Sequence, residues 1–166
     1  MENGRKDSQL QIRVSAKEKA AIRRAATLAG VDVSSWVLSK ISPPTMAQQF
    51  QALVRRLARE SDPSYCLAEI NSLLSSSRKS ELDESLRECE WRHLSPFLAN
   101  YLAAMVETTA YRAGFPAPGW TSDVKVIEIP HFASSLLSLR PYLLSNSPPA
   151  FRRRNIFIDA TIGSQV

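Results

Sequence analysis

Three polar side chains near the N-terminus have the chemistry to recognise nucleic-acid bases. Gln9, Gln11 and Arg13 alternate with apolar residues over positions 8–14, and a period of two is typical of a strand with one buried face. Glutamine pairs with adenine edges and arginine with guanine edges in the major groove, which admits a two-stranded ribbon. The polar face of this predicted strand therefore suits base recognition.

A second candidate site is the run of three consecutive arginines near the C-terminus, beside an apolar strand-like stretch. Guanidinium groups bind carboxylates and phosphates through paired hydrogen bonds. Three interpretations stay open: contact with acidic groups of a protein partner, contact with DNA phosphates, and a surface run or internal ion pairs with the acidic segment 81–90. The predicted partner-binding residues are Phe151, Arg152, Arg153, Arg154 and Asn155.

Catalytic patterns are weak. Cys89 and His93 are four residues apart, and on a helix they would lie side by side as a nucleophile and a base. A buried cysteine near a histidine is far more common than such a pair. The glycines are scattered, and neither His93 nor His131 lies in a metal-ligand pattern. We expect no enzyme activity, no cofactor and no metal site.

The local signals around the first site predict a strand, a helix, a tight turn and a second helix. Ser15 and Glu18 form a capping box that starts the first helix, and Gly30 ends it. Ser34 is predicted to cap the second helix, which ends before two prolines. The hydroxyl groups of Ser34 and Ser35 and the free N–H groups at the start of this helix would lie beside a DNA phosphate.

A single strand needs a partner for its backbone hydrogen bonds. The simplest solution is a symmetric homodimer, in which two copies of the N-terminal strand form an antiparallel ribbon. The apolar face, made of Leu10, Ile12 and Val14, would then be buried on the helices. The polar face would be presented twice to the DNA.

The stretch QLQIRVSAKEKAAIRRAATLAGVDVSSWVLSKI resembles the ribbon-helix-helix (CopG/Arc/MetJ-like) family, with closest similarity to antitoxins of bacterial toxin–antitoxin operons. It covers about a fifth of the chain, and Trp36 stands where the family usually has Phe. The resemblance implies a dimeric protein that binds operator DNA and represses its own operon.

The rest of the chain is predicted to be a larger helical domain. Apolar spacing indicates helices over residues 46–57, 63–74 and 82–89, with a polar loop at 75–80 between the last two. Ser95 and Pro96 begin the clearest helix, which ends at Gly114. Beyond it, residues 124–129 suggest an extended segment, and residues 136–144 a short helix interrupted by a proline.

Segments of this region, LSPFLAN and SPPAFRRRNIFID, resemble a C-terminal module of uncharacterised bacterial proteins found beside nucleotidyltransferase-like toxins. The resemblance covers about residues 94–160. It implies binding and neutralisation of a partner rather than catalysis.

Charge and composition fit this division. Residues 1–61 carry a net charge of +6 and residues 62–166 a net charge of −1, which favours a nucleic-acid-binding N-terminal part. No apolar run approaches a membrane span, and the N-terminus has no apolar signal-peptide core. Two cysteines do not make a disulfide framework, which is typical of a protein in a reducing compartment. We therefore expect a soluble cytoplasmic protein that does not bind membranes.

We therefore predict a mainly α fold, with a dimeric ribbon-helix-helix DNA-binding domain at residues 1–44 and a helical partner-binding domain at residues 45–166. The predicted function is that of a type II antitoxin that neutralises a cognate toxin. Two alternatives remain: a transcriptional regulator with an effector pocket near Trp91, Tyr101 and Trp120, and an accessory DNA-binding protein of a plasmid or other mobile element.

Overall fold

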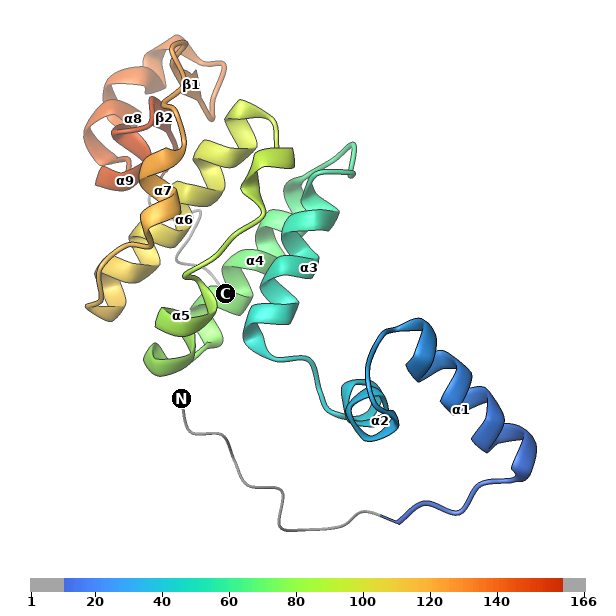
Figure 1. Cartoon of the computed structure of the whole chain (residues 1–166). Helices are drawn as coiled ribbons and strands as arrows, with labels where there is room; N and C mark the ends of the chain where they lie inside the picture. The colour runs from blue at the N-terminus through green and yellow to red at the C-terminus, as the bar shows by residue number, and fades with distance from the viewer. Residues whose placement is uncertain (1–10, 160–166) are drawn as a thin grey trace. The chain divides into compact units, whose positions relative to one another are not determined.

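The computed structural model describes residues 11–159 of the 166-residue chain. Over this range the fold is mainly helical and holds one small two-stranded sheet, which confirms the predicted mainly α class. Packing divides the chain into an N-terminal unit, residues 1–44, and a C-terminal unit, residues 45–166 (Figure 1).

The first helix of the N-terminal unit, α1 (Ala16–Leu28), begins and ends as its sequence predicts. The Ser15 side chain accepts a hydrogen bond from the Glu18 N–H, and the Glu18 carboxylate accepts one from the Ser15 N–H at 2.8 Å. The hydrogen bonds that the Ser15 N–H and the Ser15 hydroxyl donate to the Glu18 carboxylate lower the pKa of this carboxyl. Gly30 then adopts a left-handed conformation with φ of +69°, and the Val31 N–H reaches back to the Ala26 carbonyl at 3.1 Å.

The second helix, α2 (Val33–Ile41), begins earlier than predicted. Its N-cap is Asp32, whose carboxylate accepts a hydrogen bond from the Ser35 N–H at 3.0 Å. The prediction of Ser34 as the cap was wrong, because aspartate is an equally good cap and stands two positions earlier. Ser34 and Ser35 consequently lie in the first turn.

The predicted N-terminal strand is described only in part. Gln11 to Val14 lie in neither a helix nor a strand, and Gln9 and Leu10 fall outside the described residues. A strand at this position stays a prediction, because it depends on pairing with a second copy.

Four helices form the main body of the C-terminal unit: α3 (Met46–Leu57), α4 (Ser64–Ser76), α5 (Lys79–Ser85) and α6 (Pro96–Ala113). Helix α3 packs on α4 and α5, and α6 packs on α4, α5 and the later helices α7 and α9. A core of side chains from these elements surrounds α6, on which Leu102, Ala103 and Val106 are fully buried. The polar loop predicted at 75–80 was too long, since α4 continues to Ser76 and α5 starts at Lys79.

The ends of α6 agree with the sequence prediction. The Ser95 side chain accepts a hydrogen bond from the Leu98 N–H, and Pro96 occupies the first turn. At the other end, Gly114 adopts a left-handed conformation with φ of +70°. Between α5 and α6 lies only a short 3₁₀ turn, η1 (Trp91–His93).

The region after α6 holds short elements: α7 (Gly119–Asp123), β1 (His131–Phe132), η2 (Leu137–Leu139), α8 (Arg140–Asn146), α9 (Pro149–Arg152) and β2 (Ile156–Phe157). Strands β1 and β2 pair in parallel, with His131 opposite Ile156 and Phe132 opposite Phe157. The predicted interruption by Pro141 was also wrong, because this residue lies in the first turn of α8.

The extended segment predicted at residues 124–129 forms no strand. Its carbonyl groups are used by side chains instead of a sheet: the Lys125 carbonyl accepts from Asn100 Nδ2, and the Ile127 carbonyl accepts from Asn155 Nδ2. The parallel pairing falls just beyond, at His131 and Phe132. Alternating apolar residues thus indicated an extended chain, but nonlocal partners decided where the ladder forms.

Candidate functional site

The described part of the predicted base-reading strand is accessible. The side chains of Gln11 and Arg13 are exposed, as the prediction requires. Those of Ile12 and Val14, predicted to be buried in a dimer, are exposed in the single chain as well. In this segment the polar side chains and the apolar side chains are therefore both accessible to solvent.

The predicted phosphate site at the start of α2 has an unexpected neighbour. The Asp32 carboxylate accepts hydrogen bonds from both the N–H and the hydroxyl of Ser35. Its negative charge opposes a phosphate at this helix end, although the positive end of the helix dipole favours one. Ser34 is exposed and is the side chain at this end that faces the solvent for such a contact.

The N-terminal unit buries almost nothing within its own chain. Among residues 11–44, Ala26 alone is buried. Large apolar side chains are exposed across this unit, and Leu28 keeps 90% of its surface accessible. The exposed set is Ile12, Val14, Leu28, Val31, Val33, Leu38 and Ile41.

The arginine cluster is divided between the interior and the surface. Arg154 is only 5% exposed. Its guanidinium pairs with the Glu107 carboxylate on α6 through Nε and Nη2. The remaining donors reach Asn100 Oδ1 at 3.2 Å and the Thr121 carbonyl at 2.7 Å. This network joins α6, α7 and the turn after α9.

Two other predicted partner-binding residues are also structural. Phe151 is buried, and its ring meets Tyr101 edge-on with centroids 5.1 Å apart. Asn155 has a positive φ of 58° and donates to the Ile127 carbonyl at 2.8 Å. A partner contact through Phe151 or Arg154 would require this packing to open. Within the cluster, only Arg152 and Arg153 are exposed.

The buried network was missed by sequence reasoning. We expected any internal ion pair of the arginines to involve residues 81–90, whereas Arg154 pairs with Glu107. The partners Asn100, Glu107 and Thr121 lie 33 to 54 residues away along the chain. One local sign was available: Asn100 is the one amide or charged residue in the otherwise apolar stretch 96–106 of α6.

The comparison of the chain with known families concerns its N-terminal part. Residues 9–49 match the family model described as Antitoxin TacA 1-like. The match covers α1, α2 and the first residues of α3. It supports an antitoxin of a toxin–antitoxin system, implies a cognate toxin as partner, and suggests a regulatory rather than an enzymatic protein. No curated protein and no solved structure matches the chain.

Outside the residues that match the antitoxin family model, Cys89 and His93 do not lie on one helix. Residues 86–90 lie beyond the end of α5, and His93 belongs to η1. Burial, and to a lesser extent the neighbouring Glu90 carboxylate, raises the pKa of the Cys89 thiol to about 12. A nucleophilic cysteine needs the opposite shift, because the thiolate is the reactive form.

We expect Cys89 to alkylate slowly in the folded protein. At pH 8, a pKa of about 12 leaves about a thousandfold less thiolate than an ordinary thiol has. The measurement is the rate of iodoacetamide labelling of the Cys89 peptide, read by mass spectrometry with and without urea. Equal rates in the two conditions would contradict the low reactivity expected of the folded Cys89 thiol.

The raised pKa of Cys89 also affects folding stability. Since the pKa of this thiol is higher in the folded than in the unfolded chain, the thiol lowers stability only as the pH rises from about 9 towards 12.

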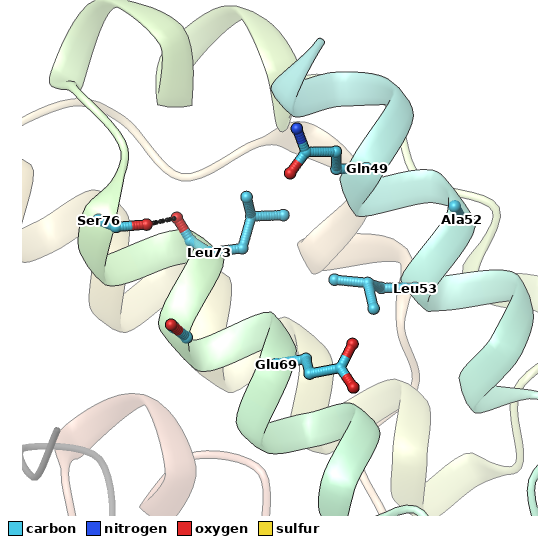
Figure 2. Close-up of a pocket in the computed structure, with 7 residues that line it drawn as sticks. Gln49, Ala52, Leu53, Glu69, Leu73 and Ser76 are labelled. Atoms are coloured by element: carbon cyan, nitrogen blue, oxygen red, sulfur yellow. Dashed lines mark hydrogen bonds between the residues drawn. The ribbon is translucent and has the colours of Figure 1, made fainter. Parts of the chain in front are cut away.

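One of the three residues expected to line the effector pocket of the alternative hypothesis belongs to the core. Trp120 is buried, and its indole N–H donates to the Leu86 carbonyl at 2.9 Å. An open groove of about 500 Å³ lies instead between α3 and α4 (Figure 2). Glu69, which pairs with Arg56, lines the groove from α4 together with Leu73, and Leu53 lies opposite on α3. The lining residues are Gln49, Ala52, Leu53, Glu69, Ser72, Leu73 and Ser76.

Within residues 11–159, no three or more His, Cys, Asp and Glu side chains are grouped to hold a metal ion. In the same range, no helix has the length and apolar character to cross a membrane.

Proposed function

We propose that the chain is an antitoxin that binds operator DNA as a homodimer through its N-terminal unit and binds a toxin through its C-terminal unit. The observation that carries this proposal is the match of residues 9–49 to an antitoxin family, combined with the uncovered apolar side chains of that same unit.

The dimer follows from the energetics of the N-terminal unit. One buried residue among positions 11–44 is too little apolar burial to offset the entropy of ordering two helices. A second copy that pairs through residues 8–14 would cover Ile12 and Val14, and each large apolar side chain so buried contributes about 1.5–3 kcal/mol. The ribbon-helix-helix arrangement is the proposed form of this dimer.

DNA recognition is assigned to the polar side of the same segment. In the dimer, Gln9, Gln11 and Arg13 from two copies face the major groove, which accommodates a two-stranded ribbon. The exposed Ser34 at the start of α2 supplies a phosphate contact. Exposed cations on α1 add attraction that weakens with salt.

Replacement of Arg13 tests this assignment. We expect Arg13→Ala to lower affinity for the DNA upstream of the operon about 100-fold, because two copies each lose a contact worth about 1–3 kcal/mol. The measurement is fluorescence anisotropy with labelled operator duplex and a scrambled duplex. Arg112→Ala, an exposed arginine of the C-terminal unit, is the matched control. Unchanged operator affinity of Arg13→Ala would refute the readout proposal.

Toxin binding is assigned to the C-terminal unit because it folds around its own core and has no part in the predicted DNA-binding surface. Within the arginine cluster, the exposed Arg152 and Arg153 are the proposed contacts to acidic groups of the toxin. A nucleotidyltransferase-like toxin remains the proposed partner class.

A further inference from the structure

A short stretch of the C-terminal unit exposes many large apolar side chains. Between residues 136 and 146, which cover η2 and α8, only Leu143 is buried. Leu137 is 68% exposed and Leu136 is 60% exposed. We call the exposed set the apolar ridge: Leu136, Leu137, Leu139, Tyr142 and Leu144.

This exposure is unusual for a folded surface. Contiguous apolar patches larger than a few hundred Å² are rare on soluble monomers and mark interaction sites. Five large apolar residues within nine positions are exposed, on a segment in which Leu143 is the one buried side chain. Figure 1 places α8 at the edge of the C-terminal unit, where a partner can approach it.

Two side chains of the segment are already held in place. The Tyr142 hydroxyl donates to the Asp159 carboxylate at 3.2 Å, which fixes the exposed ring. The Arg140 guanidinium lies 4.9 Å above the Phe132 ring, which is itself stacked on Phe157. Tyrosine and arginine are enriched among the residues that dominate binding energy, and side chains ordered in advance lose less entropy on binding.

Charge indicates the chemistry of the partner. Residues 129–159 contain four arginines and one acidic residue, Asp159, which accepts the hydrogen bond from the Tyr142 hydroxyl. Arg154 is neutralised internally by Glu107, whereas Arg140, Arg152 and Arg153 are exposed. A partner that complements this region has an apolar groove with carboxylates at its border.

We propose that the η2–α8 segment inserts the apolar ridge into an acid-bordered groove of the cognate toxin. The inference rests on the proposed antitoxin function, since the family match implies a toxin as partner. Helices bind grooves in this way through apolar residues three, four and seven positions apart; Leu137 in η2 and Leu144 in α8 are seven positions apart. Arg152 and Arg153 act at the rim, where charges contribute less than buried apolar anchors.

The test uses the full-length chain and the product of the adjacent open reading frame, co-expressed and then titrated by calorimetry. We expect L137S/L144S to weaken binding at least 100-fold, and Arg140→Glu and R152S/R153S to weaken it about tenfold. The control Y65S/Y111S removes two large side chains elsewhere that are more exposed than Leu137 and Leu144, and it should leave the affinity within twofold. Circular dichroism checks that each variant keeps its fold.

Each outcome is decisive. If the wild-type chain does not bind the neighbouring product, both the antitoxin proposal and this inference fail. If the wild type binds and L137S/L144S binds within threefold of it, only the ridge assignment is overturned. Loss of self-association by L137S/L144S with unchanged toxin affinity would assign the ridge to a second copy, and would also overturn the inference.

Discussion

Replacement of Arg154 by alanine is expected to destabilise the chain by about 3–5 kcal/mol, the usual cost of removing one partner of a buried ion pair. The Glu107 carboxylate would remain with little solvent access, because its side chain is 16% exposed. Asn100 Oδ1 and the Thr121 carbonyl would each lose a donor. Urea unfolding at a fixed protein concentration measures the loss.

Two variants separate the ion pair from the rest of this network. Arg153→Ala removes the exposed neighbouring arginine, so its stability should stay within about 0.5 kcal/mol of wild type. R154M/E107M removes both charges and should recover part of the loss, but two buried acceptors still lack their donor, at about 1–3 kcal/mol each. If Arg154→Ala unfolded within about 1 kcal/mol of wild type, the network would not stabilise the fold as described.

Introduction of charge on the apolar face of the N-terminal segment should abolish both dimerisation and DNA binding. In the proposed dimer, I12D/V14D places four carboxylates in an apolar interface, and each unpaired buried charge costs several kcal/mol. Operator affinity should fall by about a thousandfold or more, because the base-reading side chains need both copies. Sedimentation equilibrium and operator binding are the two measurements.

The neighbouring residue provides the matched control. Arg13→Ala lies between the two substituted positions and should lose operator affinity while it sediments as a dimer. Opposite oligomeric states from adjacent positions are the signature of a two-residue period. A dimeric I12D/V14D variant would exclude the proposed ribbon.

Local signals were read from the sequence with good accuracy. The capping box of Ser15 and Glu18, the left-handed Gly30, and the Ser95–Pro96 start of α6 depend on residues within one turn of each other. At α2 the sequence offered two capping residues two positions apart. Asp32, and not Ser34, is the N-cap. Its carboxylate therefore lies at the helix end where a phosphate contact was predicted.

Nonlocal partners account for what the sequence did not reveal. Arg154 and Arg153 are chemically identical in sequence, yet only Arg154 meets Glu107, 47 residues away. The exposure of Leu137 and Leu144 was equally hidden, since a predicted short helix does not indicate which of its leucines is covered. Leu143 alone is buried in that helix, and this depends on how the surrounding chain packs.

The attachment of α8 through Leu143 has a consequence for the way such proteins diversify. Outward-facing positions on this helix contribute little to folding, so substitutions there carry small stability costs. Recognition can therefore drift independently of the scaffold, and duplicated copies in one genome could acquire separate partners without first losing their fold.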